Sequence, residues 1–237
     1  MVAVLAVFAV CGACTVDRTY RCSSYIQGYY AIDSLTATLS EVQSGGVCYD
    51  EVDIRVSACH PLGSYLDSGG EFARYSGLHN DNAHKMYEDF GAYIWYPGDD
   101  ISSVRVRCTG EWDEDHPSGS DLADISIFAG LTVRPYIDGG YVPCEYGPDA
   151  DYPLLECVFP EMREWKTQPW YPVCKSLRDI HPEDMSLVGG RGDVRPLFSI
   201  FIPVGRNDGF CSLELKVTDV SGKTFSLEIP PAADVGD

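Results

Sequence analysis

Apolar and polar residues alternate over several short stretches of this 237-residue chain. Every second residue is apolar in four of them, at 52–57, 104–108, 213–218 and 225–229. A period of two is typical of strands that bury one face in a core. Less regular apolar stretches predict four further strands, at 29–39, 90–96, 124–133 and 197–204. The pattern therefore predicts an all-β chain.

Turn signals and long polar connections separate these strands. Residues 206–209 and 220–223 have the composition of tight hairpin turns, which indicates antiparallel pairing. Helix signals are few: residues 81–89 predict one short helix, and Pro182 opens a second. Together these features predict a β-sandwich of two sheets with long loops and one or two short helices.

The N-terminus has the pattern of a secretion signal. Residues 2–10 are an unbroken apolar run, followed by small residues, and the run is too short to span a bilayer. We expect residues 1–13 to be a signal peptide, cleaved near Ala13 or Cys14, and residues 14–237 to be one secreted domain. A lipoprotein anchor at Cys14 is the alternative interpretation.

Eight cysteines are spread through the expected mature domain. An even set of widely spaced cysteines behind a secretion signal predicts a disulfide framework. Zinc sites favour close pairs, whereas Cys48 and Cys59 are the nearest neighbours in this set, so we expect no metal. Four disulfides allow 105 pairings, and the spacing does not choose among them. The set is Cys22, Cys48, Cys59, Cys108, Cys144, Cys157, Cys174 and Cys211.

Charge narrows the class of partner. The chain has 36 acidic and 17 basic residues, for a net charge of −19. We therefore expect no binding to nucleic acid or to anionic membranes, because both require neutralising cations. The same charge would attract a basic protein partner, although acidity that only maintains solubility is an equal alternative.

Catalytic patterns are weak. The sequence contains no Gly-x-Ser-x-Gly elbow, and its histidines form no metal-binding pair at helical spacing. Paired acids, such as Glu111 with Asp113, would suit a glycosidase, but adjacent acids are expected in so acidic a chain. We expect a protein that is not an enzyme and uses no cofactor, with a secreted hydrolase as the remote alternative.

Two segments combine aromatic rings with features suited to recognition. In the first, Trp112 precedes Asp113, Glu114 and Asp115, so that a ring stands beside charges that would pair with lysine or arginine. The second segment, residues 165–171, is made rigid by proline, and its aromatic rings either pack inside the protein or contact a partner. We favour a structural role that shapes a binding edge for its four candidate residues, Trp165, Pro169, Trp170 and Tyr171.

Several short segments occur in the collinear order of one known family. They are Ser-Ile-Phe-Ala-Gly-Leu at 126–131 with Pro143-Cys144 downstream, Ile-Ser-Ser-Val-Arg-Val-Arg-Cys at 101–108, and a C-terminal block from His181-Pro182 to Phe-Cys-Ser-Leu-Glu-Leu at 210–215. These segments resemble the secreted poxviral immune-evasion proteins. Members of that family include chemokine-binding proteins, the parapoxviral inhibitor of granulocyte-macrophage colony-stimulating factor and interleukin-2, and a binder of B7 costimulatory ligands.

The resemblance implies a two-sheet β-sandwich without catalysis that sequesters a host immune protein. Trp165, Pro169 and Trp170 resemble the Trp-x-Pro-Trp cluster of the cytokine inhibitor, with two extra residues between them. We therefore expect a decoy for a host cytokine. A CC-chemokine binder and a binder of B7 ligands are the alternatives within the family, and a surface protein that captures nothing is the alternative outside it. Whether the chain forms a homodimer stays open.

Overall fold

The structure is a computed structural model. It describes residues 20–21, 24–66, 70–81, 86–87, 95–145, 152–164, 167–189, 196–204 and 211–231. Some predictions lie outside these residues: the signal peptide at 1–13, the alternative anchor at Cys14, Cys22, Trp165 and the turn at 206–209. Those predictions stand as they were made.

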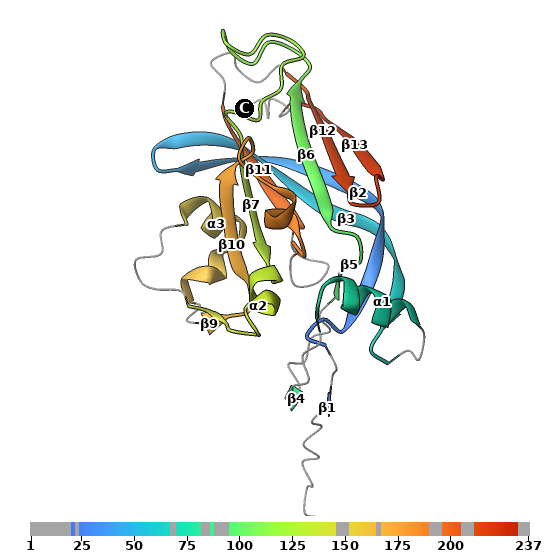
Figure 1. The fold of residues 1–237 in the computed structure, drawn as a ribbon. Coiled ribbons are helices and arrows are strands. Elements are labelled where there is room, and N and C mark those ends of the chain that lie inside the picture. Colours follow the sequence, from blue (N-terminus) through green and yellow to red (C-terminus); the bar gives the residue numbers. More distant parts are fainter. Residues whose placement is uncertain are drawn as a thin grey trace, which may run out of the picture.

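A six-stranded sheet forms the larger part of the fold (Figure 1). Its strands lie in the order β10-β7-β11-β3-β2-β5, so strands distant in sequence become neighbours. All of its pairs are antiparallel except β2 with β5, which is parallel and departs from the purely antiparallel expectation. The strands are β2 (Gly28–Ser44), β3 (Val47–Ser64), β5 (Trp95–Pro97), β7 (Ile127–Thr132), β10 (Tyr171–Ser176) and β11 (Phe198–Pro203).

The long hairpin of β2 and β3 extends beyond the rest of the sheet (Figure 1). Its two-residue turn is Gly45-Gly46, with φ of 59° and 81°. Positive φ at both turn positions matches the twist of an antiparallel hairpin and favours glycine. Three register shifts between Tyr29 and Leu35 interrupt the regular pairing of β2 with β3.

A second, three-stranded sheet has the order β13-β12-β6. Its strands are β6 (Ile101–Cys108), β12 (Leu213–Asp219) and β13 (Thr224–Ile229), all antiparallel. The predicted turn at 220–223 joins β12 to β13, as expected. The strict alternation of buried and less buried residues in β12 confirms the period-two prediction for this segment.

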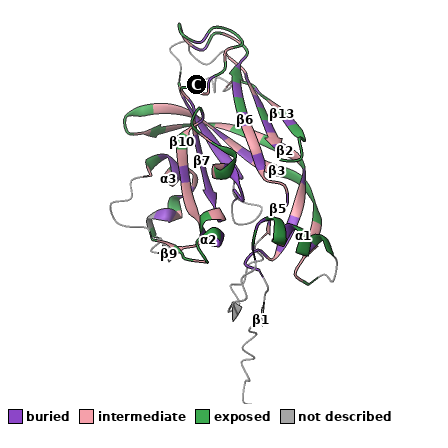
Figure 2. Cartoon of the chain, viewed as in Figure 1, coloured by how far each residue is buried: buried purple, intermediate pink, exposed green. Residues whose placement is uncertain are grey.

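One hydrophobic cluster contains side chains from both sheets. Ile54 and Ile200 of the larger sheet belong to it, as do Val106, Leu215 and Phe225 of the smaller one. Strand β13 lies against β2, which is next to the edge strand β5, so the smaller sheet packs near this edge of the larger sheet. Buried segments accordingly concentrate along the central strands (Figure 2). The chain is mainly β, as predicted.

Helices are short but more numerous than predicted. The expected helix at 81–89 is wrong, because the helix lies earlier, and residues 86–87 form strand β4. The 3₁₀ turn η2 (Pro182–Met185) begins at the predicted proline. The other helical elements are α1 (Gly70–Leu78), α2 (Arg134–Asp138), α3 (Pro153–Val158) and η1 (Pro160–Glu164). Two-stranded pairs complete the fold: β1 (Tyr20–Arg21) with β4 (Met86–Tyr87), and β8 (Cys144–Glu145) with β9 (Thr167–Gln168).

Candidate partner-binding surface

The first predicted binding segment is a folded loop, and its tryptophan faces inward. Trp112 is 6% exposed and packs in the shared core cluster. Its Nε1–H donates to the carbonyl oxygen of Pro203 at 3.2 Å. The ring lies in the core because the loop folds back onto the end of β11, and its contact with a partner stays a prediction. Glu114 and Asp115 are exposed, and as contact residues they stay a prediction.

His116 holds this loop together. Its Nδ1 lies 2.7 Å from Asp113 Oδ1, and its Nε2 lies 3.2 Å from Asp124 Oδ1. Arg178 lies on the far side of Asp124, with a 3.4 Å ion pair. The imidazole is buried and bridges two carboxylates, which favours its protonated form. Asp113, expected to meet a partner, is already engaged within the loop.

The pKa values of the three bridged groups move apart. Burial alone would lower the pKa of His116, but hydrogen bonds to Asp113 and Asp124 outweigh it and raise that pKa above 6.5. Burial alone would raise the pKa of Asp113 and of Asp124. The hydrogen bond of each to the His116 ring outweighs burial and holds both pKa values below 3.8. The form with a protonated His116 and two ionised aspartates is thus favoured at pH values between the lowered aspartate pKa values and the raised histidine pKa.

The bridge makes stability depend on pH. A raised histidine pKa contributes stability that is complete below pH 6.5 and is lost as pH rises through the folded-state value. The lowered carboxylate pKa values contribute stability above pH 3.8 that is lost as pH falls through theirs. We expect His116→Gln to lower the free energy of unfolding by about 1–2 kcal/mol at pH 5.5 and by less than half of that at pH 9. Urea titrations at both pH values measure this, and an equal loss at both would contradict it.

The second predicted segment lies at a sheet edge. Pro169 and Trp170 lead into β10, which begins at Tyr171 and is one of the two edge strands of the six-stranded sheet. Beside them lie Tyr141 and Val142, which follow α2. We call these five residues the aromatic edge. All are half-buried except Val142, which is 58% exposed.

Trp170 fixes the aromatic edge to the interior. Its ring packs against two further hydrophobic clusters, one that contains Tyr96 and one that contains Phe201. Its Nε1–H donates to the Tyr96 hydroxyl at 3.2 Å. The Tyr171 hydroxyl donates to the carbonyl oxygen of Val142 at 2.8 Å. The segment before β10 and the segment after α2 are thus joined. These contacts agree with a structural role for the tryptophan that shapes an edge.

Tyr141 occupies a strained backbone conformation. Its φ is +66°, a left-handed value that bulky residues rarely adopt. Its N–H donates to Tyr136 O at 2.7 Å, and its ring meets the Tyr136 ring edge-on with centroids 5.5 Å apart. Such strain is kept only where surrounding contacts impose it, and it gathers at functional sites. This residue supports the choice of the aromatic edge as the candidate surface.

A buried carboxylate, Asp81, accepts a hydrogen bond from the hydroxyl of Tyr141. Asp81 is fully buried and accepts hydrogen bonds from the N–H groups of Tyr25 and Ile26, at 2.8 and 2.7 Å, and from the Tyr141 hydroxyl at 3.0 Å. Burial raises the pKa of Asp81, against the opposing effect of these donors. One side chain, in the segment after α1, therefore connects the segment before β2 with the aromatic edge.

Acidic side chains gather at the far end of the β2–β3 hairpin. Glu41 lies directly opposite Asp50, a like-charge pair that is unfavourable in a sheet. Burial, then the charge of Glu41, raises the pKa of Asp50. Burial, then the charge of Asp53, raises the pKa of Glu51. A cationic partner would relieve this repulsion.

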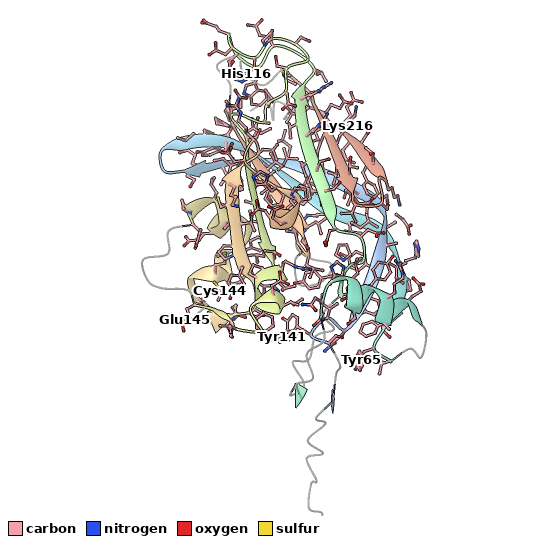
Figure 3. All side chains as sticks on the ribbon, viewed as in Figure 1. Tyr65, His116, Tyr141, Cys144, Glu145 and Lys216 are labelled. Carbon is pink, nitrogen blue, oxygen red and sulfur yellow. The ribbon has the colours of Figure 1, made fainter. Side chains whose placement is uncertain are left out.

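The structure separates the two predicted binding segments. Figure 3 shows His116 at one end of the molecule and Tyr141, Cys144 and Glu145 at the opposite end. A single partner surface therefore does not combine them. Sequence reasoning missed Tyr141, Val142 and Asp81, because it is the fold that brings residues 81 and 141 beside the aromatic segment.

Two of the predicted disulfide cysteines lie close together. Cys108 ends β6, and Leu213, its direct partner in β12, is two residues beyond Cys211. Cys211 Sγ lies 3.0 Å from the N–H of Gly110. Burial, then the neighbouring Cys211, raises the pKa of the Cys108 thiol. No disulfide joins any two described cysteines, and the predicted framework stays a prediction.

Neither a metal site nor a membrane-spanning helix was found in the part of the chain that the structure describes, and no known relative was found for the chain. Within the described residues, no three His, Cys, Asp or Glu side chains are grouped to hold a metal ion. No helix among those residues is long and apolar enough to cross a membrane. Comparison with protein-family models, with curated proteins and with solved structures gave no match.

Proposed function

We propose that this protein is a secreted decoy that binds a host cytokine and blocks its receptor contact. The observation that carries the proposal is the aromatic edge: aromatic rings fixed by the contacts of Trp170 and Asp81, beside an exposed Val142, at the start of the edge strand β10. Rigid, half-buried aromatic side chains supply binding area at little entropic cost. The resemblance to secreted poxviral immune-evasion proteins supplies the class of ligand.

The proposal includes a disulfide-linked β-sandwich. Two sheets that contribute to one core cluster support the sandwich arrangement. Cys108 and Cys211 support a crosslink between the end of β6 and the segment before β12. Such a crosslink suits a domain that works outside the cell.

A chemokine binder is the second candidate. The acidic end of the β2–β3 hairpin, with Glu41 opposite Asp50, favours it, because a basic ligand surface would pair with these charges. The dependence of binding on salt concentration distinguishes a chemokine binder from a cytokine binder. Binding led by charge weakens steeply between low and physiological ionic strength, whereas binding through the aromatic edge does not.

Substitution at Trp170 tests the proposed edge. We expect Trp170→Ala to weaken cytokine binding by about thirtyfold, a loss of about 2 kcal/mol, because the aromatic edge loses the packing that holds its rings in place. Trp170→Phe retains most of the packing and should lose far less. Surface plasmon resonance measures both, after circular dichroism has shown that each variant is folded. Unchanged affinity in folded Trp170→Ala would remove the aromatic edge from the binding site.

A further inference from the structure

A basic hollow lies on the outward face of the three-stranded sheet, away from the aromatic edge. Arg105 and Arg107 alternate with the buried Val104 and Val106 on β6, so both guanidinium groups face solvent. Glu214 and Lys216 of β12 lie opposite them, and the four charged side chains line a hollow of about 60 Å³. Figure 3 shows Lys216 on this outer face.

The charges in this hollow are unbalanced. Lys216 lies directly opposite Arg105 in the register, and like charges at opposite positions destabilise a sheet. The one carboxylate of the group, Glu214, pairs with Lys216 at 3.1 Å. The lining itself therefore carries three cations and one anion, a charge of +2, in a chain whose net charge is −19, and the exposed Asp121 and Glu228 lie outside it, beside Arg107 and Glu214.

The two arginines differ from the other arginines whose side chains the structure describes. Neither Arg105 nor Arg107 forms an ion pair with a described residue, although the chain has about twice as many acids as bases. Four other described arginines each form an ion pair with a carboxylate: Arg55, Arg74, Arg134 and Arg178. Two adjacent guanidinium groups left unpaired in so acidic a protein indicate an anionic ligand from outside.

We propose that this hollow binds one compact oxyanion of the sulfate or phosphate type. Guanidinium groups donate paired hydrogen bonds that match such oxygens, and Lys216 adds a point charge. A hollow of about 60 Å³ suits a single small group. An extended polyanion would meet the carboxylates of Asp121 and Glu228 next to the hollow, which would repel it.

The test is an NMR titration of the ¹⁵N-labelled chain with sodium sulfate and sodium phosphate, at ionic strength held constant with chloride. The Nε–Hε signals of Arg105 and Arg107, assigned from the single variants, should shift saturably, with a Kd of about 1–10 mM. Phenyl sulfate and phenyl phosphate form parallel arms. Tighter binding of an ester identifies a group carried by a partner, and equal binding of the inorganic ions identifies the ion itself.

The variants supply the control. Arg105→Gln/Arg107→Gln changes only exposed side chains and should weaken binding at least about tenfold. Arg55→Gln/Arg74→Gln removes the same charge from arginines already in ion pairs and should leave the Kd unchanged. The proposal is overturned if none of the four anions binds saturably, or if both double variants lose affinity equally.

Discussion

Replacing Cys211 by serine in the oxidised protein is expected to lower the free energy of unfolding by about 4–5 kcal/mol. The proposed Cys108–Cys211 bond closes a loop of about 100 residues, and restricting so long a loop removes much of the conformational entropy of the unfolded chain. Both residues lie at the same end of the β6–β12 pair, so the bond requires no change of register.

The control is the same comparison of Cys211→Ser with the wild-type protein, made under reducing conditions. Once the wild-type bond is reduced, the difference between the two proteins should fall below about 1 kcal/mol, since serine at this half-buried position can still accept the hydrogen bond from the Gly110 N–H. Mass spectrometry of peptides from the unreduced protein should join residue 108 to residue 211. Thiols at both positions in secreted protein, or a crosslink from either to another cysteine, would show that the pairing is wrong.

Asp81→Ala is the second substitution with a large expected effect, a loss of about 3–5 kcal/mol of unfolding free energy. It leaves the N–H groups of Tyr25 and Ile26 buried without their acceptor and releases the Tyr141 hydroxyl. Each unsatisfied buried donor costs about 1–3 kcal/mol. Tyr141 should then leave its left-handed conformation, so partner affinity should fall together with stability.

Asp33→Ala is the matched control for that loss. Asp33 also accepts a hydrogen bond from a side chain, at 2.8 Å from His60, but both side chains are well exposed. An exposed pair contributes about 1 kcal/mol or less, so this variant should remain close to wild type. Chemical denaturation of both variants measures the difference. Similar small losses would mean that Asp81 does not anchor the aromatic edge.

Local pattern predicted the strands because each buries one face. The alternation at 104–108 and 213–218 became β6 and β12, where the apolar residues enter the core. The pattern missed the Gly45-Gly46 hairpin, whose composition is a recognised turn signal, and it misplaced the helix near residue 81. Helices of five or six residues such as α2 and α3 carry too few turns to show a helical period.

The candidate surface was predictable only in part. Proline and tryptophan at 169–170 predicted a structural segment that shapes a binding edge; the structure shows that they precede the edge strand β10, and the binding stays a prediction. Burial of Trp112 depends on the loop reaching Pro203, and the role of Asp81 depends on contacts about 55 and 60 residues away in sequence. Contacts between residues so far apart in sequence produce no local sequence pattern from which they could be predicted.

The most direct test of the proposed function is a binding measurement on the secreted, oxidised protein. Immobilised protein is exposed, by surface plasmon resonance at physiological ionic strength, to a panel of host cytokines, chemokines and B7 ligands. We predict nanomolar binding to one cytokine, granulocyte-macrophage colony-stimulating factor or interleukin-2 first among them. Absence of binding to every member of the panel by folded protein would contradict the proposal that this protein is an immune decoy.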